Sequence, residues 1–233
     1  MLLKPLKRTT FFNLAASREV MTKKMLIIDL DGALVKSRPF DMAHQEWFRI
    51  MAELLRDQTI TQHAFKENYY EQVHHVMKQY LGDISESSRN MFARNMYGMC
   101  LVEIIKKWDV YEPFAEYLHA IKKKYLLILI TTTPAIAVDA LLEKIHCKDL
   151  FDVIIKGPLD KEPHKKELFE LFLKKYGKPE FYIGKGDKSI EVCKDLGIKT
   201  ITVSWIAEGT HKGNFEAKTV EDVEKILERY RIE

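Results

Sequence analysis

Short runs of apolar residues recur along the chain, and most of them show no alternation with polar positions. Aliphatic and β-branched residues dominate these runs, a composition typical of strands that are covered on both faces. We therefore predict five buried strands, at residues 25–30, 125–131, 152–156, 180–184 and 200–205.

From residue 125 onward the predicted strands alternate with helical patterns at 135–146, 164–177 and 189–197. Strand–helix alternation indicates a parallel sheet with helices on both faces and right-handed crossovers. The predicted fold class is α/β, with a Rossmann-like parallel sheet as the core.

The first two strands are separated by about ninety residues, which is too many for a single crossover. Met and aromatic residues recur in this segment at three- and four-residue spacing, which predicts helices that bury a small core of their own. Gly82 and Pro113 are the expected breaks in these helices. We predict an N-terminal extension at 1–24, a core made of 25–37 and 111–233, and a helical cap at 38–110.

Composition excludes some classes of protein. Apolar residues make up 46% and charged residues 30% of the chain, and the net charge of +3 reflects 37 basic and 34 acidic groups. This near balance gives no reason to expect a nucleic-acid partner. No run approaches the roughly 18 apolar residues that a membrane helix needs. Cys100, Cys147 and Cys193 form no CxxC pair, which indicates a reducing, cytoplasmic compartment.

The first 24 residues leave two interpretations open. They are basic and rich in hydroxyl groups, with Glu19 as the only acid, as in organelle-targeting peptides. An additional helix, or an extension upstream of a start at Met21, explains the same composition.

The stretch "MLIIDLDGALV" places Asp29 and Asp31 two residues apart, at the carboxyl end of the first strand. Ligands bind at this end of the strands in open α/β sheets. Gly32 then allows a sharp turn and a close approach to a ligand. The tetrapeptide alone is common in ordinary turns, but its buried lead-in and the helical segment that follows favour a functional pair.

This stretch resembles the first motif of the haloacid dehalogenase superfamily, Asp-x-Asp-Gly-Thr, with Ala33 in place of the threonine. From residue 25 to about 207 the chain resembles a superfamily phosphatase with a C1-type helical cap. The resemblance implies that Asp29 is a nucleophile forming an aspartyl-phosphate, and that Asp31 is the general acid and base. It also implies a small phosphorylated metabolite as substrate and Mg²⁺ as cofactor.

The family's second motif is an apolar strand that ends in Thr or Ser, and Thr131 in "LLILITTTP" matches it. The resemblance implies that Thr131, Thr132 and Gly32 bind phosphate, with Pro134 beginning a helix whose positive end faces the anion. The purely structural interpretation is that threonine, as a β-branched residue, favours the ends of strands.

The family also supplies a lysine at the start of the helix before the fourth strand. Counting back along the helix favours Lys165 as the phosphate-binding catalytic lysine, with Lys161 and Lys166 as rivals. Most lysines in this segment are expected to be ordinary solvated residues.

The fourth motif departs from the family pattern. Gly184 matches the motif glycine, but Lys185 and Ser189 stand where two acids are expected. In one interpretation Asp187 completes a metal site with Asp29 and Asp31 in a rearranged turn. In the other, the Lys185 ammonium takes the place of the metal.

These interpretations give two functions. We predict a magnesium-dependent phosphatase, and the alternative is a catalytically impaired protein that binds a phosphate ligand or regulates a partner. A phosphomutase also fits, whereas dehalogenation does not need Asp31. The oligomeric state is not predicted.

Several side chains of the predicted cap are candidates to line the cleft, although each one is more typical of the surface or of the core of the cap: His44, Trp47, Arg49, His74, His75, Arg89 and Arg94. The sequence suggests no functional role for the segment 205–211, which follows the last predicted strand.

Overall fold

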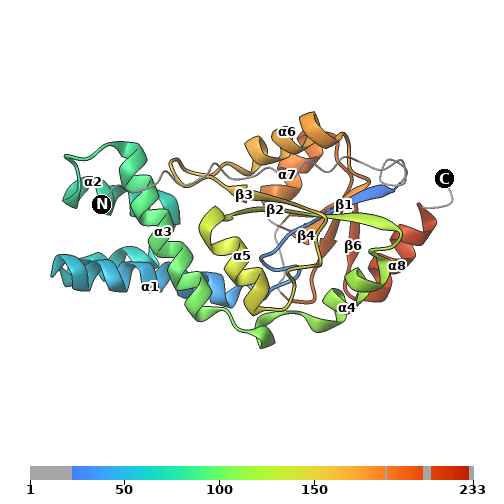
Figure 1. Ribbon diagram of the computed structural model, residues 1–233, viewed down its shortest axis with the longest axis horizontal. Coiled ribbons are helices and arrows are strands. Elements are labelled where there is room, and N and C mark those ends of the chain that lie inside the picture. Colours follow the sequence, from blue (N-terminus) through green and yellow to red (C-terminus); the bar gives the residue numbers. More distant parts are fainter. Residues whose placement is uncertain (1–22, 187, 207–210, 231–233) are drawn as a thin grey trace, which may run out of the picture.

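The computed structural model describes residues 23–186, 188–206 and 211–230 (Figure 1). Most of the predicted N-terminal extension (residues 1–22 of 1–24), the predicted ligand Asp187 and part of the segment 205–211 lie outside these residues. In the described part, six parallel strands form one sheet in the order β3-β2-β1-β4-β5-β6. The predicted parallel α/β fold is confirmed. The strands are β1 (Lys24–Ile28), β2 (Tyr125–Pro134), β3 (Val153–Gly157), β4 (Phe181–Lys185), β5 (Thr200–Val203) and β6 (Phe215–Ala217).

β1 is a central strand, and its side chains serve two hydrophobic cores. Leu26 and Ile28 pack into the larger core, while Ile27 packs into the smaller one on the opposite face, and all three are fully buried. Successive residues of a strand point to opposite faces, so an unbroken apolar run fits a strand that is covered on both sides.

Helices cover both faces of the sheet, and a separate group of helices lies beyond one end of it (Figure 1). α6 (Lys165–Tyr176) and α7 (Lys188–Asp195) lie on one face, whereas α4 (Glu112–Ile121), α5 (Ala135–Lys144) and α8 (Val220–Arg229) lie on the other. The family-like helical insert between β1 and β2 is confirmed. Its helices are α1 (Arg38–Leu55), the 3-10 helix η2 (Gln58–Phe65), α2 (Tyr69–Tyr80) and α3 (Glu86–Ile104), followed by η3 (Lys107–Asp109).

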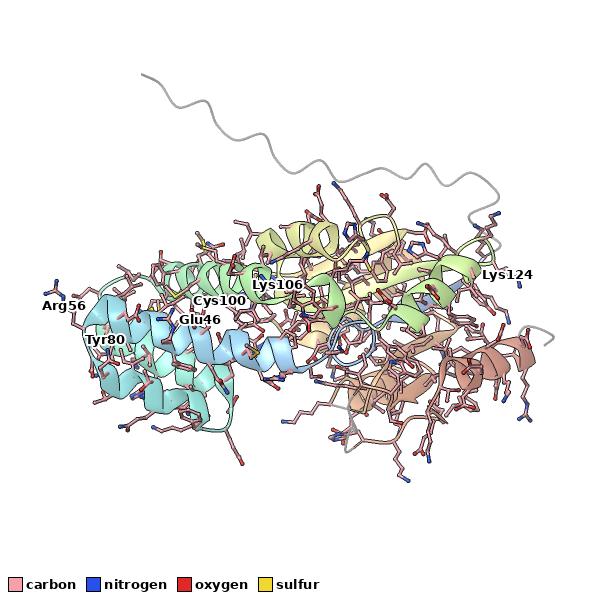
Figure 2. The ribbon with its side chains drawn as sticks, turned by 90° about the horizontal axis from the view of Figure 1, so that it is seen from below. Glu46, Arg56, Tyr80, Cys100, Lys106 and Lys124 are labelled. Carbon is pink, nitrogen blue, oxygen red and sulfur yellow. The ribbon has the colours of Figure 1, made fainter. Side chains whose placement is uncertain are left out.

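Within the insert, α1 and α3 run side by side, as the labelled Glu46 and Cys100 show in Figure 2. Trp47 is fully buried between them, and its indole N–H donates to the Ala93 carbonyl at 3.0 Å. Trp47 therefore belongs to the core of the insert and does not line the cleft.

The chain enters and leaves the insert through two segments that lie next to each other. The Lys36 N–H donates to the Asp109 carbonyl at 2.9 Å, and the Tyr111 N–H donates to the Leu34 carbonyl at 2.8 Å. This pairing places the start of α1 a few residues from the carboxyl end of β1, where Asp29 and Asp31 lie.

Two described elements were missed by the pattern of apolar runs. β6 has only three residues, of which one is buried, and α8 follows it directly. The start of α8 is fixed by a capping box, in which Thr219 and Asp222 bond each other's backbone N–H groups. None of the helices in the described part is long and apolar enough to cross a membrane.

Candidate active site

Asp29 lies immediately after β1, and its side chain is almost completely buried. Its backbone N–H donates to the Ile183 carbonyl of β4 at 2.9 Å, which fixes the residue against the sheet. Carboxylate oxygen Oδ1 accepts from the Lys165 ammonium at 2.7 Å and from the Leu30 N–H at 3.0 Å. Oxygen Oδ2 accepts from the Tyr182 hydroxyl at 2.6 Å. Hydrogen bonds to both oxygens hold the plane of the carboxylate in one orientation.

Tyr182 was not predicted as a site residue. It is fully buried in β4, and an aromatic residue within an apolar run is typical of a hydrophobic core. Gly184 lies two residues further along, on the same face of the strand, and a Cβ there would lie 2.6 Å from the Tyr182 hydroxyl oxygen. The glycine therefore leaves the space through which this hydroxyl reaches Asp29.

We expect Tyr182→Phe to lower kcat for phosphate release by about 10- to 100-fold, because a hydrogen bond to a charged group contributes about 1.5–3 kcal/mol. The ring, and hence the packing of the core, is retained. Tyr176→Phe, on the outer side of α6, is the matched control and leaves kcat unchanged. Equal kcat values for Tyr182→Phe and the unaltered chain would show that this hydroxyl does not help to position Asp29.

Lys165 is the first residue of α6, and its side chain is 15% exposed. Its two rivals lie elsewhere: Lys161 pairs with Glu167 on the surface, and Lys166 is exposed. Of the three lysines, Lys165 is therefore the one that the structure brings to Asp29.

The three threonines at the end of β2 lie around one wall of the site. Thr131 and Thr133 are buried, and the Thr131 hydroxyl donates to Thr133 Oγ1 at 2.9 Å and accepts from the Thr133 N–H at 3.1 Å. Thr132 is more exposed. α5 begins at Ala135 directly after Pro134, and the first N–H groups of a helix have no acceptor within it. Hydroxyl and backbone donors thus lie together where an anion would be stabilised.

Asp31 forms an ion pair with Lys185. The Lys185 ammonium lies 2.7 Å from Asp31 Oδ2 and 3.2 Å from the hydroxyl oxygen of Ser37, which precedes α1. The other oxygen, Asp31 Oδ1, is buried and has no hydrogen-bond partner among the described residues. Gly32 has φ +77°, and a Cβ at this position would lie 2.3 Å from Lys185 Cδ. Gly32 is therefore required both for the turn and for the passage of the lysine stem.

A cavity of about 250 Å³ brings most of these groups together. Asp29, Asp31 and Lys165 lie on its core side, with Thr131–Thr133 and Ser189 beside them. The insert contributes an aromatic wall made of Phe40, His44, Tyr69, Tyr70 and Tyr97, of which the sequence analysis had proposed His44.

His44 is the one predicted cap candidate among the described residues that lines this cavity. Its ring stacks on Tyr69 with a centroid separation of 3.8 Å and on Tyr97 at 4.9 Å. Burial, and then the positive charge of Lys185, lower the pKa of His44 to about 4. The imidazole is therefore neutral at pH 7, and the aromatic wall carries no cation of its own.

The remaining cap candidates lie away from this cavity. Arg49 pairs with Glu46 and Glu53 on the surface, and His75 is exposed. His74, Arg89 and Arg94 line a smaller neighbouring cavity. Arg94 is buried and joins the insert to the core, because its guanidinium donates to the Thr132 carbonyl at 2.8 Å and to the Pro158 carbonyl.

Two of the three predicted magnesium ligands, Asp29 and Asp31, lie together at the cavity, and each contacts an ammonium. Nowhere in the described part do three or more His, Cys, Asp or Glu side chains group closely enough to hold a metal ion. Ser189, which is neutral and buried, stands on α7 where an acid was expected, and the Lys185 ammonium already binds Asp31. The third predicted ligand, Asp187, lies outside the described residues. The described residues therefore give no basis for assigning a step of catalysis to a metal ion.

Residues 23–189 match the family model described as haloacid dehalogenase-like hydrolase. The chain belongs to this family. The match covers the insert and strands β1 to β4, and all the core residues of the site described above lie within it, so the family assignment rests on the same segments as the geometry. A search of curated proteins finds no match.

Solved structures share the fold at low sequence identity. A haloacid dehalogenase-like hydrolase from Streptococcus pneumoniae has a TM-score of 0.61 and 15% identity, with 90% of this chain and 99% of that one covered. A predicted phosphoglycolate phosphatase from Haemophilus somnus has a TM-score of 0.59 and 18% identity, with 88% and 98% covered. A family hydrolase from Bacillus subtilis, solved with bound magnesium, has a TM-score of 0.57 and 15% identity, with 88% and 99% covered.

Proposed function

We propose that this chain hydrolyses phosphate monoesters of small metabolites through an aspartyl-phosphate on Asp29. The observation that carries the proposal is the placement of Asp29, whose carboxylate is held by Lys165 and Tyr182 and borders a cavity shared with Asp31 and Thr131. A buried carboxylate that is aligned by fixed donors and faces a cavity fits the requirements of nucleophilic catalysis.

Oδ1 is the oxygen proposed to attack phosphorus. Tyr182, which bonds Oδ2, is fully buried and does not line the cavity, whereas Lys165, which bonds Oδ1, does line it. The Oδ1–P bond forms as the P–O bond to the alcohol breaks, and Asp31 gives its proton to the leaving oxygen. Asp31 then takes a proton from water, whose oxygen attacks phosphorus and releases Asp29 and inorganic phosphate.

Lys165 and the β2 threonines are proposed to hold the phosphoryl group. Lys165 lines the cavity and its ammonium contacts the Asp29 carboxylate, so the ammonium is proposed to contact a phosphoryl oxygen as well. Its positive charge then offsets the repulsion between these two anions. Thr131, Thr132 and the N-terminus of α5 provide further donors, whereas the Gly32 N–H, predicted to bind phosphate, already donates to the Val35 carbonyl at 2.7 Å. This arrangement favours a phosphoryl group over a carboxylate ester, because it supplies several separate donors around one anion.

The organic part of the substrate is proposed to be flat and uncharged. The wall opposite the carboxylates is aromatic, and its single ionisable base, His44, is neutral at pH 7. Aromatic rings gain from contact with other rings, whereas a polyhydroxylated chain would lose hydrogen bonds to water there.

We expect kcat/KM for benzyl phosphate to exceed that for glycerol 1-phosphate by about tenfold or more, as apolar pocket contacts discriminate by 10–200-fold. Both esters release a primary alcohol, so the comparison reports on binding rather than on leaving-group chemistry. Tyr70→Leu should reduce this preference. Phe65→Leu, at an 82% exposed aromatic residue of the same insert, is the matched control and should preserve it. A preference for the glycerol ester would contradict the proposed substrate class.

A second candidate function is favoured by the ion pair between Lys185 and Asp31. The Lys185 ammonium donates to Oδ2 of Asp31, the residue proposed to serve the leaving oxygen. The chain would then bind a phosphate ligand without turning it over. Thermal stabilisation by inorganic phosphate, with no phosphate release from benzyl phosphate, would select this function over hydrolysis.

A further inference from the structure

Lys185 extends from the end of β4 across the backbone at Gly32. Its stem fills the place that a side chain at Gly32 would take, and its ammonium lies between Asp31 and Ser37. The side chain is only 21% exposed. Contacts on the stem and at the tip hold the ammonium in one place, as required of a fixed charge.

The surrounding groups respond to this charge. The positive charge of Lys185 contributes to lowering the pKa of His44, after burial, and opposes the upward pKa shift that burial and Asp31 produce at Asp41. Both residues lie on α1, so the field of the ammonium extends from the core to the insert.

The charges of the described site balance without a metal ion. Two carboxylates, Asp29 and Asp31, each contact an ammonium, Lys165 and Lys185 respectively. When Asp31 carries the proton that it donates, the same four groups have a net charge of +1, which suits an incoming phosphate. A second acid on α7 would restore a site for a divalent ion, but Ser189 occupies that position.

We propose that the Lys185 ammonium supplies, beside Asp31, the fixed positive charge that a divalent cation would otherwise provide, so that turnover on Asp29 needs no added metal ion. This inference rests on the proposed function. Lys185 acts by positioning Asp31, and the Lys185 ammonium keeps its proton throughout. The bonds made and broken are therefore those of the proposed hydrolysis, and water is the only co-reactant. A single point charge directs fewer groups than an octahedral ion does, so slow turnover is expected.

The first test is phosphate release from benzyl phosphate by the full chain, treated with a chelator and then titrated with Mg²⁺. We expect rates that agree within about twofold with and without the metal, since no metal ion takes part in the step. Loss of activity in chelator and recovery with Mg²⁺ would overturn the inference while leaving the proposed hydrolysis intact. Absence of release under every condition would instead reject the proposed function.

The second test does not depend on turnover. Calorimetry should detect binding of inorganic phosphate, but no binding of Mg²⁺, by the unaltered chain. Lys185→Met should weaken phosphate binding, and Lys188→Met, an exposed lysine three residues away, should not. The double variant Lys185→Asp/Ser189→Asp should gain measurable Mg²⁺ binding. Mg²⁺ binding by the unaltered chain, or none by the folded double variant, would contradict the placement of the cation at Lys185.

Discussion

Asp29→Asn abolishes phosphate release, with a loss of at least about 10³-fold in kcat, because an amide is neutral and cannot form the bond to phosphorus. This is the largest effect that the structure predicts. The substitution keeps the shape of the side chain, and the amide oxygen still accepts one of the hydrogen bonds from Lys165 and Tyr182. Measurement of inorganic phosphate released from benzyl phosphate checks the prediction.

Asp149→Asn is the matched control, because Asp149 is exposed in the turn after α5 and lies outside the cavity. It should retain full activity. Circular dichroism and thermal unfolding should show that Asp29→Asn remains folded. A folded Asp29→Asn variant with undiminished turnover would remove Asp29 from the role of nucleophile.

Lys165→Met has the second largest expected effect, a fall of about 10²- to 10³-fold in kcat, since loss of one fixed stabilising donor has this cost in other sites. Methionine retains most of the apolar stem, but leaves the nearly buried Asp29 carboxylate without its ammonium partner. KM for the phosphate ester should also rise, because the same ammonium is proposed to contact the phosphoryl group. Steady-state kinetics measures both effects.

Lys166→Met provides a control of the same chemistry at the adjacent position of α6. Lys166 is exposed, whereas Lys165 contacts Asp29 at 2.7 Å, so the two substitutions differ in site rather than in kind. We expect normal kinetics for Lys166→Met. A stronger effect at Lys166 than at Lys165 would mean that the wrong lysine has been placed in the site.

Much of the fold follows from local pattern. β1, β2 and β4 are buried on both faces, and their apolar runs marked them clearly. The long interval between β1 and β2 likewise predicted the helical insert. β6 was missed because three residues with one buried side chain give no periodic signal. Its pairing with β5 arises from the tertiary structure.

The site was only partly accessible to sequence reasoning. The resemblance pointed to Asp29, Asp31 and Thr131 because motif spacing survives in this chain. It could not reveal Tyr182, which has the sequence character of a core residue until Gly184 is seen to leave room for its hydroxyl. Apart from His44, the aromatic wall was equally hidden, because Phe40 and Tyr97 lie on different helices and meet only in the folded insert.

Detection of the phosphoryl group on Asp29 tests the central claim most directly. Asp31→Asn should slow hydrolysis of the intermediate, because the base that activates water is lost. The variant also lacks the acid that protonates the leaving oxygen, so the substrate is 4-nitrophenyl phosphate, whose phenolate leaves without a proton. After incubation with this ester and acid quenching, mass spectrometry should find one phosphoryl group on the peptide that contains Asp29. A phosphoryl group on another residue, or none while phosphate is still being released, would contradict an aspartyl-phosphate mechanism at Asp29.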